Sequence, residues 1–280
     1  MIKWLQVEAT TKCNAWCPGC KRNQGGYQLN PLLVLEDLDF DTYVRHLETL
    51  PGLDVIDFCG TYGDAIAAHH IKDLTEVSKK YCKKIIIRTN GSLRNKDWWQ
   101  DYSEILKNFN HEIWFCIDGL KDTHSIYRQA TDFDTVIEHA KTVINNGCTA
   151  VWQFIPFAHN EHQIKECIKL SQELGFKRFE FYKNVRLDFV PRHYQTGKVY
   201  EIKEWSKNQL FSNLVSKKTK LEFSNCRHLS QPSLYLNANG KLSNCCFFNT
   251  EICGNSVHEL PNIQQELLSP RDICLHFCGQ

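Results

Sequence analysis

The sequence lacks the features that mark membrane-spanning, secreted or nucleic-acid-binding proteins. Its 280 residues include 33 basic and 32 acidic side chains, a formal net charge of +1, so no strong basic footprint for a nucleic acid is present. No apolar run is long enough to cross a membrane, and the N-terminus enters a strand-like segment without a secretory signal. We therefore expect a cytoplasmic protein without a membrane partner, for which a nucleic-acid partner is disfavoured.

Cysteine, by contrast, is abundant, with 14 residues in the chain. Disulfides are rare in a reducing compartment, so clustered cysteines in a cytoplasmic protein favour binding of a metal or an iron–sulfur cluster. Five cysteines stand singly in the middle of the chain, and we interpret them as small buried hydrophobes: Cys59, Cys82, Cys116, Cys148 and Cys167. The remaining nine gather near the two ends of the chain.

Near the N-terminus, three cysteines fall within eight residues at the spacing C-x3-C-x2-C: Cys13, Cys17 and Cys20. Iron–sulfur clusters are held by thiolates, and a cubane cluster normally takes four. Three thiolates leave one iron open, and an open metal position serves chemistry, as in catalytic zinc sites. A zinc site is one alternative, although zinc favours C-x2-C pairs completed by further ligands. A disulfide is the other.

Strand-like and helix-like segments alternate from residue 7 to about residue 182. Apolar, β-branched and aromatic runs predict strands of the kind that is buried on both faces, at 3–8, 53–58, 84–88, 112–117, 149–157 and 178–182. Amphipathic segments predict helices at 39–50, 71–81, 96–109, 134–146 and 161–174, the last two ended by Gly147 and Gly175. This α/β pattern gives about six β/α units, fewer than the eight of a closed barrel.

Polar and glycine-rich segments follow these strands at the ends where α/β folds carry their chemistry. Residues 59–64 follow the second strand, Thr89-Asn90-Gly91 the third and Asp118-Gly119 the fourth. Such segments allow a ligand to approach the backbone closely. Taken alone, Asn90 and Asp118 are ordinary turn residues, but several such ends occur in order along one chain. We therefore expect a binding site at this edge of the sheet.

A strand followed by C-x3-C-x2-C resembles the signature of the radical S-adenosylmethionine (radical SAM) enzymes, and the strand ends resemble that family's SAM-binding segments. Tyr62-Gly63-Asp64 falls where the family has Gly-Gly-Glu, whose backbone and acid hold the methionine amino group. Thr89-Asn90-Gly91 matches the third-strand segment, and residues 116–119 resemble Ser-x-Asp-Gly, with Cys116 replacing the serine that often meets the ribose. Arg128 lies where several relatives place an arginine for the SAM carboxylate; a solvated helix residue is the alternative.

The resemblance implies a fold, a cofactor set and a reaction. The fold would be a partial (β/α)6 TIM-like barrel over residues 1–183. Cys13, Cys17 and Cys20 would hold a [4Fe–4S] cluster whose open iron chelates SAM, and an external flavodoxin- or ferredoxin-type donor would supply one electron. Reductive cleavage of SAM would give a 5′-deoxyadenosyl radical that abstracts a hydrogen atom from a substrate, for a net oxidation or similar modification.

The last 55 residues contain a predicted β-hairpin at 233–243, with Asn239-Gly240 as the turn. One cysteine precedes the hairpin and another follows it, a pattern that resembles the SPASM/Twitch extension of radical SAM enzymes. The resemblance implies a bridging segment at 184–225 and a Twitch-like domain at 226–280 with one auxiliary [4Fe–4S] cluster. Its implied ligands are Cys226, Cys245, Cys274 and Cys278, with Cys246 or Cys253 as alternatives for one of them. A zinc knuckle is the competing interpretation.

The substrate is open at this stage. Peptide-modifying relatives often carry an N-terminal domain that grips a leader peptide, and here the first strand begins at residue 3. We therefore expect a small molecule, with a peptide-modifying maturase as the alternative and a non-catalytic iron–sulfur scaffold or electron carrier as a second. A zinc-dependent nucleic-acid module is the remaining hypothesis. Candidate substrate contacts, each of which core packing or an exposed polar face also explains, are His124, Trp152, Gln153 and Tyr182.

Overall fold

The computed structural model describes residues 2–182, 189–206 and 233–243. The six cysteines considered as ligands of an auxiliary cluster lie outside these ranges: Cys226, Cys245, Cys246, Cys253, Cys274 and Cys278. In the described part of the chain, no helix is both long and apolar enough to cross a membrane.

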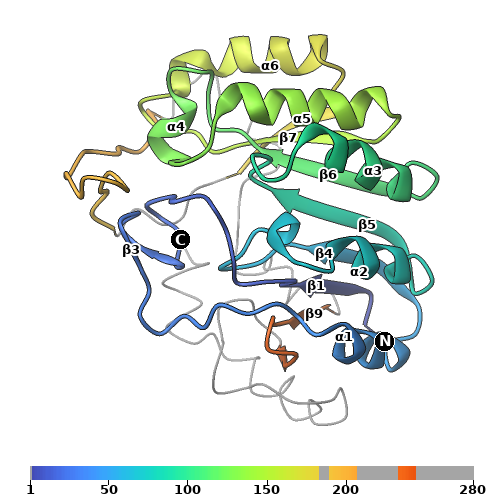
Figure 1. Ribbon diagram of the computed structural model, residues 1–280. Helices are drawn as coiled ribbons and strands as arrows, with labels where there is room; N and C mark the ends of the chain where they lie inside the picture. Colours follow the sequence, from blue (N-terminus) through green and yellow to red (C-terminus); the bar gives the residue numbers. More distant parts are fainter. Residues whose placement is uncertain (1, 183–188, 207–232, 244–280) are drawn as a thin grey trace.

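An eight-stranded sheet forms the centre of the molecule (Figure 1). Six strands are those predicted from the sequence, and they run parallel to one another in chain order. They are β1 (Trp4–Val7), β4 (Leu53–Phe58), β5 (Cys82–Thr89), β6 (His111–Cys116), β7 (Ala150–Phe154) and β8 (Arg178–Phe181). Successive parallel strands joined through helices confirm the predicted β/α units. In the described residues the sheet ends at β8 on one side, so closure into a barrel is not seen there.

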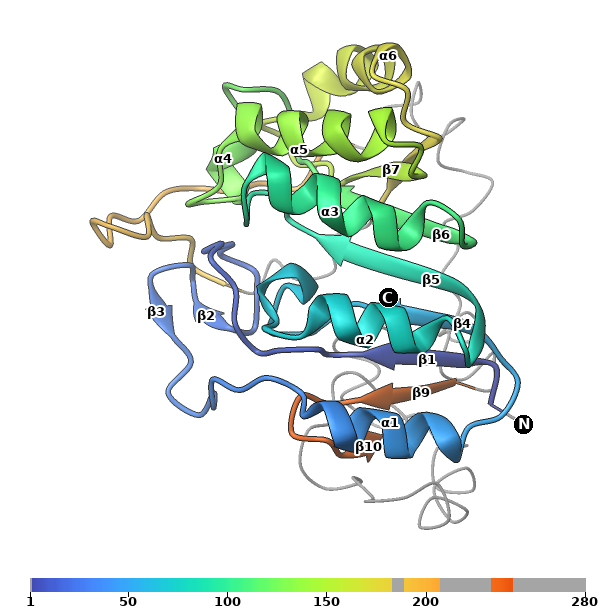
Figure 2. The same cartoon turned by 45° about the vertical axis from the view of Figure 1, so that its right-hand side comes forward.

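The predicted helices connect these strands and cover one face of the sheet (Figure 2). They are α1 (Phe40–Glu48), α2 (Ile71–Ser78), α3 (Lys96–Leu106), α5 (Phe133–Asn145) and α6 (Ile164–Glu173). Side-chain caps begin three of them, from Asp39, Asn95 and Asp132. Gly147 and Gly175, both at φ +86°, follow the ends of α5 and α6 as expected. Shorter elements that the sequence did not predict are β2 (Asn23–Gln24), β3 (Gln28–Leu29), η1 (Ala65–Ala67) and α4 (His124–Tyr127), whereas the short 3₁₀ helix η2 (Glu161–Gln163) lies at the start of the helix predicted at 161–174.

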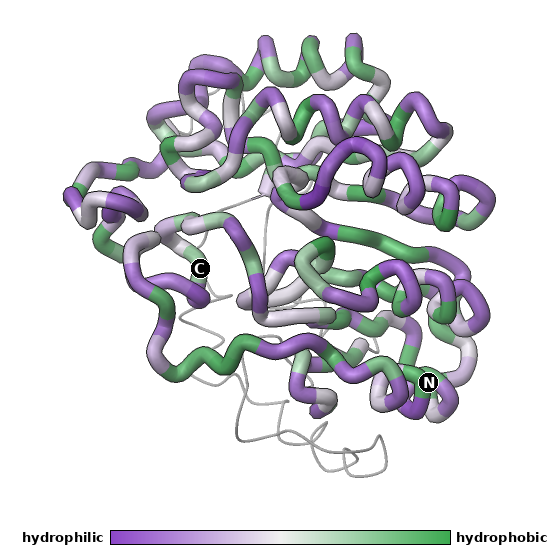
Figure 3. The backbone as a smooth tube through the Cα atoms, viewed as in Figure 1, coloured by the Kyte–Doolittle hydropathy of each residue, from purple (hydrophilic) through white to green (hydrophobic). Residues whose placement is uncertain are grey.

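The two faces of the sheet differ in chemistry. Alternate strand residues such as Leu5, Ile87 and Trp152 pack against the helices in the main apolar core, and hydrophobic colour follows the strands in Figure 3. The other face is also buried but polar, because it carries side chains such as Asp57 (0% exposed) and Gln153 (7% exposed). The expectation of strands buried on both faces holds for these residues, but only the helix-covered face is apolar.

The predicted C-terminal hairpin forms as β9 (Ser233–Leu236) and β10 (Leu242–Ser243). Its turn contains Gly240 at φ +78°, whose carbonyl contacts His46 Nε2 at 2.7 Å. The sequence did not predict where the hairpin lies: β9 pairs in parallel with β1, with Gln6 opposite Tyr235. The first strand of the predicted extension therefore continues the main sheet, whereas the domain boundaries at residues 184 and 226 stay a prediction.

Candidate functional site

The cysteine loop begins where β1 ends. In Figure 2, β1, β5 and β9 all point toward the side that carries β2 and β3. The loop is held by backbone hydrogen bonds from Cys20 N–H to the Cys17 carbonyl (3.0 Å) and from Trp16 N–H to the Gln129 carbonyl (3.0 Å). The motif therefore occupies the carboxyl-end edge of the sheet, as the strand order predicts.

The three thiols of Cys13, Cys17 and Cys20 share a small apolar cluster around Tyr127 and Phe157. Burial raises the pKa of Cys17 to about 12, and that of Cys13 is also raised, first by burial and further by the charges of its neighbours. In this setting ionised thiols need a cationic partner, which a bound metal supplies. Among the described residues no three His, Cys, Asp or Glu side chains converge to hold a single metal ion. Buried thiols are nonetheless the ligand type that an iron–sulfur cluster takes.

Asn90 brings the end of β5 onto the first cysteine. Its amide Nδ2 lies 3.5 Å from Cys13 Sγ and 2.9 Å from Asn14 Oδ1. The next residue must be glycine, because Gly91 has φ +75° and an added Cβ would lie 2.7 Å from the Phe115 ring. The structure therefore brings the predicted Asn90 beside the predicted cluster ligand.

Asp64 joins the loops that follow β4 and β5. Its Oδ2 accepts the Asn90 N–H at 2.6 Å and the Thr89 hydroxyl at 3.1 Å, and its Oδ1 accepts the Ile66 N–H at 3.0 Å. Burial raises the pKa of this carboxyl, which is 5% exposed. Three of about four acceptor positions of the carboxylate are thus used by the protein itself.

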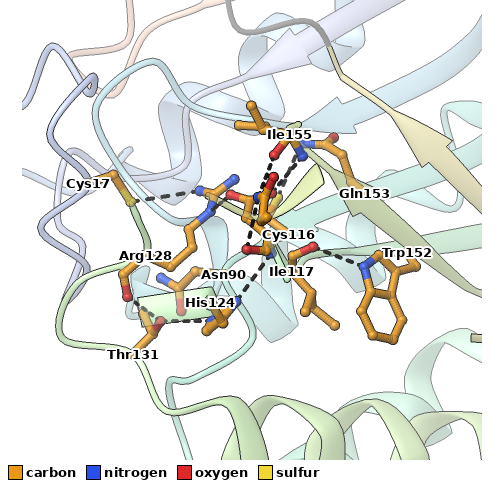
Figure 4. A network of polar contacts seen from close by, with 12 residues as sticks. Cys17, Asn90, Cys116, Ile117, His124, Arg128, Thr131, Trp152, Gln153 and Ile155 are labelled. Atoms are coloured by element: carbon orange, nitrogen blue, oxygen red, sulfur yellow. Dashed lines mark hydrogen bonds and ion pairs between the residues drawn. The ribbon is translucent and has the colours of Figure 1, made fainter. Parts of the chain in front are cut away.

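Asp118 and Arg128, both predicted site residues, form a buried ion pair, and Figure 4 shows Arg128 extending toward Cys17 of the cysteine loop. Arg128 Nε donates to Asp118 Oδ2 at 2.6 Å, and Ile155 N–H donates to Oδ1 at 2.7 Å. Arg128 Nη1 lies 3.8 Å from Cys17 Sγ. The alternative of a solvated helix residue is wrong for Arg128, whose side chain is only 13% exposed.

Sequence reasoning missed two residues that hold the loop around Tyr62 and Gly63. Glu8 (1% exposed) accepts both of their N–H groups, and it also accepts the hydroxyl of Tyr235 at 2.7 Å. Burial raises the pKa of Glu8, and these donors lower it in part. An acid directly after an apolar strand was the available signal for Glu8. The sequence carries no such signal for Tyr235, because its contact with Glu8 joins residues 227 positions apart.

The four candidate substrate contacts have different surroundings. Trp152 is fully buried, stacks on Phe179 and donates to the Ile117 carbonyl, so it is a core residue. His124 is 1% exposed and contacts the Asp118 N–H and the Thr131 hydroxyl; burial lowers its pKa to about 3.

The other two candidates lie on the polar face or at the surface. Gln153 contacts Arg88 at 3.0 Å and Cys116 Sγ at 3.4 Å on the polar face of the sheet. Tyr182 is 53% exposed. Of the four candidates, these two keep polar groups outside the helix-packed core.

No protein-family profile matches the sequence, and no curated protein matches it. Streptococcus suis SuiB bound to S-adenosylmethionine is 14% identical, with a TM-score of 0.65 over 96% of this chain and 66% of SuiB. A histidine-tagged form of anSMEcpe with bound AdoMet is 16% identical, with a TM-score of 0.68 over 100% of this chain and 85% of that one. Both of these structures hold S-adenosylmethionine (AdoMet), and this chain shares their fold.

Proposed function

We propose that this chain is a radical SAM enzyme that cleaves SAM reductively and removes a hydrogen atom from its substrate. One observation carries the proposal. The thiols of Cys13 and Cys17, the amide of Asn90 and the Asp118–Arg128 pair are far apart in the sequence, yet they meet at one edge of the sheet. The chemistry of these donors is that of a cluster site with polar groups for a ligand beside it.

Cys13, Cys17 and Cys20 would hold a [4Fe–4S] cluster, and the chemistry that the bound cluster would supply is one-electron reductive cleavage of the SAM carbon–sulfur bond to methionine and a 5′-deoxyadenosyl radical. An external flavodoxin- or ferredoxin-type protein would return the cluster to its reduced state. Arg128, fixed by Asp118, would face the SAM carboxylate. We assign Asp64 a structural role, which is to hold together the loops after β4 and β5, because protein donors already occupy most of its carboxylate.

The comparisons favour a peptide substrate over the small molecule that the sequence favours. SuiB has been solved bound to its precursor peptide SuiA, and anSMEcpe with a Cp18Cys peptide. We therefore place a peptide first and a small molecule second. An auxiliary cluster would be held by four C-terminal cysteines, Cys226, Cys245, Cys274 and Cys278. It would accept an electron from the substrate radical, so that the net reaction is an oxidation.

Metal analysis and isotope transfer test the proposal together. Anaerobically reconstituted wild type should hold iron and sulfide for two [4Fe–4S] clusters, and a variant with Cys13, Cys17 and Cys20 all changed to Ala should hold them for one. Deuterated peptide and small-molecule pools should then show which class delivers deuterium to 5′-deoxyadenosine. Zinc in place of iron would contradict the proposal in favour of a zinc module. Iron without any SAM binding would favour a scaffold or electron carrier.

A further inference from the structure

Three consecutive N–H groups after β4 turn toward one buried polar pair. Tyr62 and Gly63 donate to Glu8 Oε1 at 2.6 and 3.1 Å. The Thr61 N–H donates to the Tyr235 hydroxyl oxygen at 3.2 Å, and that hydroxyl in turn donates to Glu8 Oε2 at 2.7 Å. Successive N–H groups that face one anion form a nest, the arrangement that commonly binds an external anion. Here the anion is a side chain of the protein itself.

This arrangement fixes where the loop's carbonyl groups point. In a trans peptide the N–H and the preceding C=O point in opposite directions, and the described residues contain no cis peptide bond. Because the N–H groups of Tyr62 and Gly63 face Glu8, the carbonyls of Thr61 and Tyr62 face away from it. The Thr61 carbonyl oxygen lies 3.9 Å from Cys20 Sγ, so it is directed at the cysteine loop.

The loop is held against the chain on its other side as well. An added Cβ at Gly63 would lie 1.8 Å from the Thr10 carbonyl oxygen, and the Asp64 N–H donates to the Lys12 carbonyl at 2.9 Å. Residues 10–12 lead directly into the cysteine loop. The loop at 61–63 therefore has little freedom to rotate its peptide planes, and its carbonyls keep a fixed direction relative to the cysteines.

We propose that Glu8 and Tyr235 are positioning residues that present the Thr61 and Tyr62 carbonyls to the ammonium group of SAM. An ammonium group has only donors, so it needs acceptors and is repelled by N–H groups. Glu8 removes the N–H groups from the ligand side and places a negative charge behind the acceptors. Tyr235 completes this arrangement from β9, so the C-terminal hairpin supports the SAM site. The inference rests on the proposed function and adds residues to it.

The test compares SAM with an analogue that lacks its α-amino group, using the reconstituted holoprotein and calorimetric binding. Glu8→Gln keeps the shape but removes the negative charge behind the loop and replaces Oε2, the acceptor of the Tyr235 hydroxyl, with an N–H donor. We expect it to weaken SAM binding about tenfold to a hundredfold, the size of one or two hydrogen bonds to a charged group. Tyr235→Phe removes one hydroxyl, and we expect a loss of about fivefold. The analogue should bind both variants and the wild type equally.

Tyr43→Phe is the matched control, because Tyr43 is equally buried and its hydroxyl contacts Ser78 at 2.6 Å among the helices. It should leave both affinities unchanged. Equal weakening of SAM and of the analogue would assign Glu8 and Tyr235 a merely structural role and overturn the inference, as would unchanged SAM binding. If Glu8→Gln does not fold, Tyr235→Phe decides alone. If the wild type holds iron but binds no SAM, the proposed function is overturned too. If the wild type binds SAM and the variants lose affinity for SAM and for the analogue equally, only this inference is overturned.

Discussion

Arg128 donates a hydrogen bond of 2.6 Å to Asp118, and both side chains are largely removed from solvent. This pair joins the end of α4 to the second residue after β6, and the Ile155 N–H binds the second oxygen of Asp118. The same guanidinium lies 3.8 Å from the sulfur of Cys17. One ion pair thus fixes three strand-end segments and directs a positive charge at the cysteine loop.

Removal of Arg128 should destabilise the fold. Arg128→Met leaves the Asp118 carboxylate buried without its partner, which costs about 3–5 kcal/mol when one member of a buried pair is lost. Urea unfolding of the metal-free protein, followed by tryptophan fluorescence, measures the change. Lys83→Met is the control, because its pair with Asp54 is exposed (77% and 43%) and should cost less than about 1 kcal/mol. Equal midpoints for the two variants would contradict the structural role of the buried pair.

Arg128 should also affect the reduction potential of a cluster at this site. Hydrogen bonds to the sulfurs and nearby charge set such potentials, and Arg128 supplies both to Cys17. We expect Arg128→Gln to shift the midpoint potential to a more negative value, measured by redox titration with electron paramagnetic resonance in the absence of SAM. Lys72→Gln is the control, because the Lys72 ammonium lies over the Trp98 ring on the helix side. This variant should leave the potential unchanged. An unchanged or more positive potential in the Arg128 variant would refute this assignment.

Glu112, on the polar face of the sheet, should make stability depend on pH. Burial raises the pKa of Glu112, but hydrogen bonds from Arg178, Lys84 and Trp114 outweigh this and lower it from 4.5 to about 2. Its stabilising contribution is therefore present above pH 4.5 and is lost as the pH falls toward 2. Glu112→Gln should cost at most about 3 kcal/mol at neutral pH and progressively less below pH 4.5. Urea unfolding of the metal-free proteins across this range measures the difference, and parallel pH curves for wild type and variant would rule it out.

Gly63 should be required for SAM binding. An added Cβ would lie 1.8 Å from the Thr10 carbonyl oxygen, so Gly63→Ala must displace the loop from the segment that leads into the cysteines. We expect SAM affinity to fall more than about tenfold, the equivalent of about 1.4 kcal/mol. Gly147→Ala is the control: it strains a residue at φ +86° but meets open space after α5 and should leave SAM affinity intact. Normal SAM binding by Gly63→Ala would show that the loop does not hold the ligand.

Local pattern predicted the strands and helices of the sheet well. The runs from Leu53 to Phe58 and from Arg178 to Phe181 carry β-branched or aromatic side chains. Three of the helices begin at side-chain caps, and two are followed by a glycine. Predicted site residues from separate strand ends, such as Asn90 and Cys13, also met as expected. Parallel strands in chain order bring their carboxyl ends to one edge, so chain order alone carries this information.

Long-range pairing and side-chain direction could not be predicted in the same way. The contact between Glu8 and Tyr235 requires β9 to align with β1, and nothing local in either strand specifies that register. Trp152 and Gln153 are neighbours on β7, yet one faces the helices and the other the polar side. Two-sided burial leaves no simple alternation in the sequence from which to assign each side.

The most direct test of the radical SAM assignment is release of 5′-deoxyadenosine from anaerobically reconstituted, dithionite-reduced protein given SAM. We expect release by wild type and by Cys148→Ala, which changes a buried cysteine beside Ser103 on the helix side, and none by Cys17→Ala. Release from all three proteins would contradict the assignment of Cys17 as a cluster ligand. No release from iron-loaded wild type, with and without peptide or small-molecule substrates, would contradict the central claim.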